Sequence, residues 1–519
     1  MARLIISFVP FLLAGLVSAI ASPWSHSRPG MRQIDAVSHE VFHKTNGTKL
    51  PPLNTTYYFD QLIDHDNPSL GTFKQRYWLS YQYYEPGGPI VLMNGGEGDA
   101  SSLIGYLTNL TMVGYTAEQL RGAAVLLEHR FFGESNPYPD LSVKSFCVHT
   151  IEQAINDHEY FVKNVQLPML GGDHVSAPNE AAWILFGGSY SGALTSFTMT
   201  RKPGLFAAGY ASSAVVQAIS DYWAYYEPIR EYLAPNCTAD IEAVVNYMDG
   251  VLTSGNASAI KSLKDSFGLG AVEHNDDFAW IFANVPQSWQ SYALSIPGGP
   301  MFEFCDAMEV KDGKVSGPNG WGLDHALAAW IDYYNSTYFA GLCGSTPLSS
   351  CFSSYDTQDP SWSNTTVNNW IRSWNWLTCT QFGFWHDGAP ADRPSLVSRL
   401  ITPAYFERQC KNNFPEAFSS PPVTFLDAMD VNKQYGGWNT TVERVVFLNG
   451  RRDPWREATV AADGTTNPGS ELQPHLLGDG YHTGDTIIAE GLANPSVRAA
   501  QQQALQYIGK WLADWKPSS

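Results

Sequence analysis

Apolar residues along this chain fall into short unbroken runs that alternate with stretches of helical spacing. Five runs have the length and composition of strands buried on both faces, and they lie at 89–93, 123–129, 183–186, 207–216 and 444–448. Between two of them, residues 151–165 place apolar side chains near the spacing of an amphipathic helix. Strands that alternate with helices predict an α/β fold around a largely parallel sheet.

The ends and the middle of this pattern differ from the rest. Residues 57–79 contain F-D-Q-L-I-D-H and F-K-Q-R-Y-W-L, which predict an opening hairpin, and residues 497–512 line one face of a packing helix. The long stretch between the runs at 207–216 and 444–448 lacks strand alternation and contains aromatic helical patches. We interpret it as a mainly helical insertion that caps the active site.

The N-terminus has the pattern of a secretory signal peptide. Met1-Ala2-Arg3 precedes an apolar stretch that ends in the small-x-small sequence Ala19-Ile20-Ala21. No later segment is apolar enough to span a bilayer, so we expect no membrane association after its removal. The predicted organisation is a signal peptide (1–21), a propeptide or flexible arm (22–50), a first hydrolase part (51–217), a helical cap (218–435) and a second hydrolase part (436–519).

Sequons and cysteines agree with passage through the secretory pathway. Seven cysteines predict up to three disulfides with one cysteine left over, in a pairing that the sequence does not determine. The spacing of Cys and His residues does not resemble a zinc site, and we expect neither a metal nor another cofactor. Eight N-x-S/T sequons are candidate glycosylation sites: Asn46, Asn54, Asn109, Asn236, Asn256, Asn335, Asn364 and Asn439.

The charge balance narrows the classes of partner. A formal net charge of -19, from 50 Asp and Glu against 31 Lys and Arg, argues against binding to nucleic acid. The same balance fits a secreted protein that works in acid, where protonated carboxyls repel one another less.

The sequence G-G-S-Y-S-G at 187–192 follows a predicted strand and precedes a helix-compatible segment. This is the arrangement of a nucleophile elbow, in which Ser189 sits on a sharp turn and small neighbours make room for it. Ser191 stands where the strict G-x-S-x-G pattern has its last glycine. We predict that Ser189 is the nucleophile.

Two later loops supply an acid and a base in the order that α/β-hydrolases use. Asp453 follows the strand R-V-V-F-L in N-G-R-R-D-P-W, and His482 lies in the glycine-rich loop G-D-G-Y-H-T-G-D. Asp479 and Asp485 are rival acids, but each is too near His482 in sequence to come from a separate strand end. We expect the oxyanion donors to be the backbone N–H of Tyr190 and those of the N-G-G-E-G loop, at Gly95 and Gly96.

These motifs resemble those of the lysosomal Pro-X carboxypeptidase and dipeptidyl-peptidase family of serine peptidases. The resemblance rests on G-G-S-Y-S-G-A-L, L-L-E-H-R-F-F-G-E-S at 126–135, N-G-x-x-D-P-W at 449–455 and W-N-W-L-T-C-T-Q-F-G at 374–383. Within that family the chain is most similar to the fungal acid prolyl endopeptidases, through F-G-L-G-A-V-E-H at 267–274 and D-G-A-P at 387–390.

The resemblance implies an α/β-hydrolase fold with a large helical lid and cleavage after proline by a triad of Ser189, Asp453 and His482. It also implies that Trp455, Glu97 and Trp385 bind substrate, with Trp455 walling the proline pocket. The chain departs from the lysosomal members at three positions: Ser191 replaces glycine, Ala193 replaces methionine and Gln381 replaces glutamate.

We therefore expect a secreted serine peptidase that acts on proline-containing peptides or proteins through an acyl-enzyme, at mildly acidic pH. Burial of His482 under the lid would keep its imidazole neutral there. A lysosome- or vacuole-like compartment is the alternative location. A secreted esterase or lipase of the same fold, or a catalytically silent binding protein, is the alternative function, and the sequence leaves open endo-, carboxy- or dipeptidyl-peptidase action.

Overall fold

The computed structural model describes residues 30–34, 41–169, 177–339, 343, 346–418 and 428–516. The expected signal peptide lies outside these residues, and so does part of the expected arm at 22–50. Within the described part of the chain, no helix combines the length and the apolar character needed to cross a membrane.

The centre of the molecule is an eight-stranded sheet in the order β1-β2-β4-β3-β5-β6-β9-β10. The first hairpin pairs antiparallel, β2 also runs antiparallel to β4, and the remaining neighbours are parallel. The predicted hairpin and all five predicted strands are confirmed. The strands are β1 (Tyr57–Leu62), β2 (Thr72–Ser80), β3 (Ile90–Asn94), β4 (Ala123–Leu127), β5 (Trp183–Gly188), β6 (Ala208–Ser212), β9 (Val445–Gly450) and β10 (His475–Gly478).

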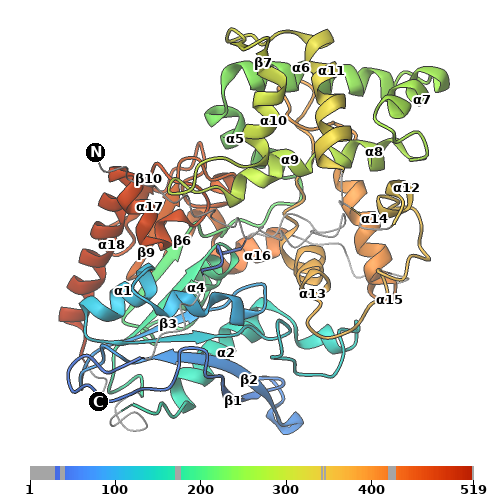
Figure 1. Cartoon of the computed structure of the whole chain (residues 1–519). Coiled ribbons are helices and arrows are strands. Elements are labelled where there is room, and N and C mark those ends of the chain that lie inside the picture. Colours follow the sequence, from blue (N-terminus) through green and yellow to red (C-terminus); the bar gives the residue numbers. More distant parts are fainter. Residues whose placement is uncertain are drawn as a thin grey trace, which may run out of the picture.

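Helices cover both faces of this sheet and bury two separate cores. On one face α1 (Met112–Gln119) and α18 (Pro495–Asp514) pack against alternate side chains of the parallel strands. On the other face α2 (Ile151–Asn164) and α4 (Tyr190–Arg201) cover the side chains that point the opposite way. A mostly parallel sheet covered on both faces, with its antiparallel strands at one edge, is an α/β-hydrolase fold, which confirms the expected fold class (Figure 1).

The chain between β6 and β9 is mainly helical, as expected. Among the described residues of this segment, the hairpin of β7 (Val310–Lys311) and β8 (Lys314–Val315) is the one piece of sheet. Figure 1 shows most of its helices gathered at one end of the molecule, beyond the sheet. The α-helices of the whole segment are α5 (Glu227–Tyr232), α6 (Pro235–Leu252), α7 (Ala257–Ser266), α8 (Asn275–Ile281), α9 (Asn284–Gln287), α10 (Pro300–Glu309), α11 (Leu323–Tyr333), α12 (Leu348–Cys351), α13 (Trp370–Leu377), α14 (Pro403–Asn413), α15 (Pro415–Phe418) and α16 (Ala428–Tyr435). We call this segment, residues 213–444, the cap.

Three disulfides form inside the cap, and one cysteine remains free, as the cysteine count predicts. Cys237–Cys305 joins α6 to α10, and Cys379–Cys410 joins the turn after α13 to α14. The third bridge, Cys343–Cys351, closes a short loop. Cys147 is free and exposed.

The motif L-L-E-H-R-F-F-G-E-S, which carried part of the family resemblance, is a structural junction after β4. Its Glu128 is fully buried and accepts hydrogen bonds from Arg76 and from both the backbone and the hydroxyl of Ser135. Its Arg130, also fully buried, is paired with Asp157 of α2. Buried charges of this kind are retained only when paired, so the motif fixes this loop against β2 and α2.

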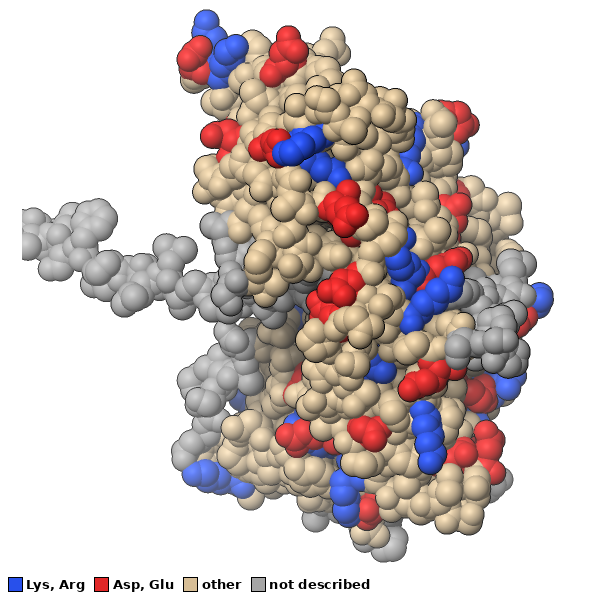
Figure 2. Space-filling view, turned by 90° about the vertical axis from the view of Figure 1, so that its right-hand side faces the viewer, with Lys and Arg blue, Asp and Glu red and all other residues tan. Residues whose placement is uncertain are grey.

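Charged side chains on the outer surface are mixed in sign. On the face seen in Figure 2, Lys and Arg side chains lie interspersed with Asp and Glu over both the cap and the hydrolase part. This face therefore lacks the extended basic area that binding to a phosphate backbone requires.

Candidate active site

Ser189 occupies the single residue between the end of β5 and the start of α4. Its backbone has φ 65° and ψ -126°, a strained conformation for a residue with a side chain. The strand and helix approach so closely here that a Cβ on Gly187 would lie 2.0 Å from the carbonyl oxygen of Ser191. A Cβ on Gly192 would lie 2.6 Å from the carbonyl of Ser212. The two glycines are thus required by the turn that presents Ser189.

Ser191 stabilises the same turn, although the strict motif has glycine there. Its hydroxyl accepts a hydrogen bond from the N–H of Gly188 at 3.0 Å and donates one to the carbonyl of Gly188 at 2.8 Å. The hydroxyl therefore makes its hydrogen bonds within the elbow and is not directed at a substrate.

The structure brings Ser189, His482 and Asp453 into one hydrogen-bonded row. Nε2 of His482 lies 2.8 Å from Oγ of Ser189, and Nδ1 lies 2.8 Å from Oδ1 of Asp453. Since the Asp453 carboxylate only accepts, Nδ1 carries the proton and Nε2 is left to accept from the hydroxyl of Ser189. All three side chains are buried, with exposed fractions of 1% or less for His482 and 0% for Ser189 and Asp453.

Three of four neighbouring strands supply the backbone positions of this row. Ser189 follows β5, Asp453 lies three residues after β9, and His482 lies four residues after β10. β6 lies between β5 and β9 in the sheet, and the parallel strands end at one edge. Residues far apart in the sequence therefore meet at the carboxyl ends of the strands, where open α/β sheets hold their ligands.

The two rival acids lie elsewhere. Asp479 forms a two-pronged ion pair with Arg452, and this pairing lowers the pKa of the Asp479 carboxyl. Asp485 accepts hydrogen bonds from the hydroxyls of Tyr210 and Ser212. Asp453 is thus the carboxylate that contacts His482.

The expected oxyanion donors divide into two groups. Tyr190 and Gly96 fit the expectation. Tyr190 is the first residue of α4, so its N–H has no partner within the helix. Gly96, with φ 65°, packs against Ser191 beside the elbow. Gly95 does not fit the expectation. Its N–H donates to the carbonyl of Leu127 at 2.8 Å as part of the β3–β4 pairing, which removes it as an oxyanion donor.

Trp455 lies next to the row, completely buried, with its ring centroid 6.1 Å from that of His482. Its indole N–H donates to the side-chain oxygen of Gln290, a cap residue, at 2.7 Å. Four further rings surround it at centroid distances of 4.7–5.7 Å, namely Tyr222, Tyr225, Phe384 and His386. We call these four rings and Trp455 the aromatic wall.

The sequence analysis identified one member of this wall and missed four. The run F-G-F-W-H at 382–386 was the available signal for two of them, but the expectation fell on Trp385. In the structure Trp385 stacks nearly parallel on Phe406 of α14 inside the cap, while Phe384 and His386 on either side of it face Trp455. Trp385 therefore does not belong to the aromatic wall, and its expected substrate contact stays a prediction.

Glu97, the remaining expected substrate-binding residue, is buried near the elbow with an exposed fraction of 2%. Burial, followed by the nearby charge of Glu97, raises the pKa of Tyr190 well above its ordinary value. The hydroxyl of Tyr190 is held 3.0 Å from Nε2 of His129. Glu97 thus lies near Tyr190, the residue that follows the nucleophile.

Of the eight sequons, seven place their asparagine on the surface, and Asn236 is half-buried and donates to the hydroxyl of Ser316.

Within the described residues, no group of three or more His, Cys, Asp or Glu side chains could hold a metal ion.

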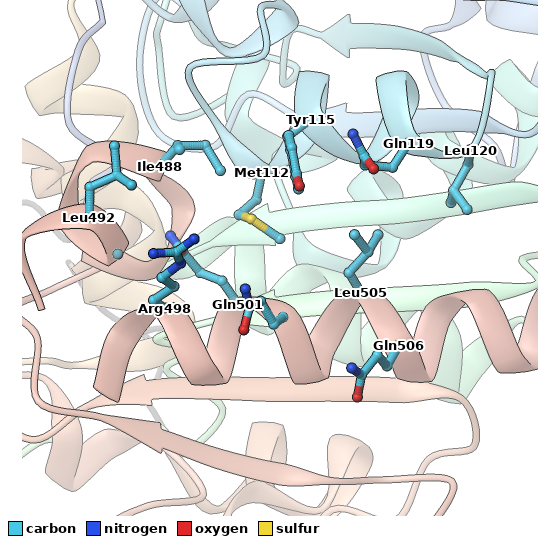
Figure 3. A pocket seen from close by; sticks show the side chains of 12 residues that line it. Met112, Tyr115, Gln119, Leu120, Ile488, Leu492, Arg498, Gln501, Leu505 and Gln506 are labelled. Carbon is cyan, nitrogen blue, oxygen red and sulfur yellow. The ribbon is translucent and has the colours of Figure 1, made fainter. Parts of the chain in front are cut away.

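A cavity of about 700 Å³ lies away from the row, between α1, α17 (Ile488–Ala493) and α18. Figure 3 shows Met112 and Tyr115 of α1 on one side of it and Leu505 of α18 on the other, with Leu492 and Arg498 at one end. None of its lining residues belongs to the row or to the aromatic wall.

Comparison with known proteins places the chain among serine peptidases. The family model "Serine carboxypeptidase S28" matches residues 61–504. Serine protease vicPa of Bipolaris victoriae is 34% identical over 475 residues, which cover 88% of each chain. A probable extracellular serine carboxypeptidase of Arthroderma benhamiae is 29% identical and is matched over 64% of its length by 85% of this chain. Human lysosomal Pro-X carboxypeptidase is 24% identical over 98% of each chain. The match to the family model covers most of the sequence, and the chain belongs to the serine carboxypeptidase S28 family of α/β-hydrolase serine peptidases.

Proposed function

We propose that this protein is a secreted serine peptidase that hydrolyses peptide bonds on the carboxyl side of proline, with Ser189 as nucleophile, His482 as base and Asp453 as orienting acid. The observation that carries the proposal is the buried Asp453–His482–Ser189 row, with both hydrogen bonds at 2.8 Å, beside the aromatic wall. Membership of the family supplies the reaction class, and the row supplies the residues.

In the proposed mechanism Oγ of Ser189 attacks the carbonyl carbon of the residue before the scissile bond while Nε2 of His482 takes the hydroxyl proton. Charge develops on the carbonyl oxygen, which the N–H groups of Tyr190 and Gly96 stabilise. His482 then gives its proton to the leaving amine, and the acyl-enzyme forms. A water molecule follows the same path, loses a proton to His482 and releases the new carboxylate and the free serine.

The aromatic wall supports the choice of proline. A proline ring is compact and apolar, and its nitrogen has no N–H that would need a partner in a dry pocket. Trp455 links this wall to the acid, because its backbone N–H donates to Oδ1 of Asp453 at 2.8 Å. The human relative's name, lysosomal Pro-X carboxypeptidase, points the same way.

Secretion is supported by the N-terminal pattern, by the disulfides and by the seven exposed sequons. One relative is named as extracellular and another as lysosomal, and a lysosome- or vacuole-like compartment is the alternative location.

Function in mild acid is supported by two sets of buried titratable groups. Burial raises the pKa of Asp277 to about 7 and that of Asp387 to about 9, so these carboxyls stabilise the fold fully below about pH 4 and progressively less above it. Burial lowers the pKa of His129 to about 4 and that of His158 to about 3, so these imidazoles destabilise the fold as the pH falls below about 6.5. Together the two sets favour greatest stability between about pH 4 and 6.5.

The first prediction concerns the row. Ser189→Ala and His482→Ala should each lower kcat by about 10⁶-fold on a proline peptide, because members of a triad act as a unit. Ser191→Gly is the matched control, since its hydroxyl serves only the elbow, and it should retain most activity. Steady-state kinetics on folded samples test this, with an ester substrate in parallel. Turnover of the proline peptide by the Ser189→Ala protein would contradict the assignment of Ser189 as nucleophile. Turnover of the ester, but not of the proline peptide, by the unaltered protein would contradict the assignment as a peptidase.

The second prediction concerns the aromatic wall. Trp455→Ala should lower kcat/KM on a peptide with proline before the scissile bond by about 10- to 200-fold more than on the same peptide with alanine there, since a lost pocket contact costs roughly 1–3 kcal/mol. The matched control is Trp321→Ala in the cap, at a residue that is 38% exposed. Equal losses on the two peptides would assign Trp455 a structural role only.

The third prediction concerns the pH dependence of activity. We expect kcat/KM for a proline peptide to stay high in mild acid, because the buried carboxyls and imidazoles described above favour the folded state in that range. The measurement is kcat/KM from pH 3 to 9 in buffers of constant ionic strength. An acidic limb at or above pH 6.5, with little activity at pH 5, refutes the proposal of acid function.

The fourth prediction concerns the pH dependence of stability. Because the Asp387 carboxyl stays protonated in the folded protein up to about pH 9, it should destabilise the fold progressively as the pH rises above about 4. Asp387→Asn removes this titration, so its thermal midpoint should fall less between pH 5 and pH 8 than that of the unaltered protein. Asp392→Asn, at an exposed position, is the control and should leave that fall unchanged. An unchanged fall in Asp387→Asn would show that Asp387 is ionised in the folded protein.

A further inference from the structure

The loop that carries His482 is anchored three residues later by a buried carboxyl. Asp485 has an exposed fraction of 4%, and both of its oxygens are engaged by residues of β6. Oδ1 accepts from the hydroxyl of Ser212 at 2.7 Å, and Oδ2 accepts from the hydroxyl of Tyr210 at 2.9 Å. The mechanism above does not use Asp485, and neither of these contacts reaches His482 directly.

Ser212 connects this anchor to the nucleophile. While its hydroxyl donates to Asp485, its carbonyl accepts a hydrogen bond from the N–H of Ser189 at 2.8 Å. A single residue at the end of β6 therefore contacts both the elbow and the loop of the base. A second link runs in parallel, because the N–H of Thr483, next to His482, donates to the hydroxyl of Ser213 at 3.0 Å.

Asp485 is held from behind as well. Gln501 of α18 donates to the backbone carbonyls of Asp485 and Ile487, at 2.9 Å in each case. Tyr210 stacks on Phe186 of β5 with a centroid distance of 4.4 Å and an angle of 15° between the rings. The carboxyl thus sits between the sheet and α18 with little freedom to move. Thr483, with φ 52°, shows that the loop is held in a strained backbone conformation.

We propose that Asp485 is a positioning residue that, through Ser212, sets the distance and direction between Nε2 of His482 and Oγ of Ser189. The proposal rests on the proposed function, in which these two groups are the base and the nucleophile. The physical reason is that proton transfer needs a heavy-atom distance of about 2.6–3.2 Å, and a misplacement of about 1 Å costs roughly 10²-fold in rate.

The charge of Asp485 adds a pH-dependent element to this role. Burial raises the pKa of Asp485 to about 7, the hydrogen bonds from Ser212 and Tyr210 lower it, and the charge of Asp453 raises it. The other groups that face it are Tyr106, from the helical turn after β3, and the uncharged Gln501. Asp485 is thus neutral in mild acid. Above about pH 7 its ionisation places a second negative charge near Asp453, which should lower activity in that range.

The test compares Asp485 with Asp479, which lies three residues before His482 and whose carboxylate is paired with Arg452. Each variant is measured for kcat, for KM on a proline peptide and for the rate at which a serine-directed phosphonylating reagent labels Ser189. Asp485→Ala should lower kcat and the labelling rate by about 10- to 100-fold, with KM within about twofold, because only the alignment of the base is lost. Asp479→Ala should leave both rates within about threefold.

Two more variants separate positioning from general damage. Asp485→Asn keeps the shape and the neutral state of the group, so it should match the unaltered protein at pH 5 and exceed it above pH 7. Ser212→Ala should lower the labelling rate, and combining it with Asp485→Ala should add no further loss, because the two residues act through one hydrogen bond. If Asp485→Ala does not fold, Asp485→Asn and Ser212→Ala still decide the question.

The outcomes distinguish this inference from the proposed function. Labelling of Asp485→Ala at the unaltered rate, or strictly additive losses with Ser212→Ala, overturns the positioning role while Ser189 remains the labelled nucleophile. An Asp485→Asn profile that declines above pH 7 as in the unaltered protein overturns the pH-dependent element. If the unaltered protein is not labelled at Ser189, the proposed function itself fails.

Discussion

The structure depends on one strained residue, Ser189, whose backbone turns the chain directly from β5 into α4. A residue with a side chain adopts this conformation only when its surroundings over-determine it. Here Gly187 and Gly192 lack the side chains that would collide, and the hydroxyl of Ser191 closes the turn. The carbonyl of Ser212 on the next strand accepts a hydrogen bond from the N–H of Ser189.

The order of strands in the sheet then determines which residues can lie next to Ser189. Because β6 and β9 follow β5 in the sheet and β10 is at the edge, the loops after β9 and β10 reach the elbow from one side.

The cap is bound to the same loops and so takes part in the site. The indole N–H of Trp289 donates to the carbonyl of Arg452, one residue before Asp453, and Gln290 accepts from the indole of Trp455. On the other side Glu490, fully buried in α17, accepts from the backbone N–H groups of Leu294 and Ser295 in the cap. The cap thus contacts the loop of the acid and the helix that follows the loop of the base. Any movement of the cap must break or stretch these bonds, and this couples access to the site with its geometry.

The sequence predicted the features that depend on local pattern and missed those that depend on contacts between distant segments. Continuous apolar runs indicated β3 to β6 and β9 because these strands are buried on both faces, whereas β10 has only four residues, partly exposed at the sheet edge, and gave no such run. Ser189 and Asp453 followed from predicted strand ends, whereas His482 followed from its glycine-rich loop and from the order of residues in α/β-hydrolases. The error at Gly95 and the omission of Phe384 and His386 have a different origin. The N–H of Gly95 is already paired with the neighbouring strand, and Phe384 and His386, but not Trp385 between them, face Trp455. Both facts depend on tertiary packing, which the periodicity of the sequence does not show.

Asp453 and Asp485 show how one site gives two buried carboxyls different states. Asp453 contacts the imidazole of His482, which in the proposed mechanism becomes positively charged during the reaction. Asp485 faces two hydroxyls that stay neutral, and burial therefore raises its pKa to about 7. A negative charge on Asp485 would be repelled by a charge on Asp453, and protonation of Asp485 in mild acid removes that repulsion. The protonated oxygen then donates to a neighbouring hydroxyl, and the other oxygen still accepts. Asp485, which anchors the loop of the base, and Asp453, which contacts the base itself, are therefore separate residues. In the acidic range Asp485 is neutral, and Asp453 is then the one of the two carboxyls that acts on His482.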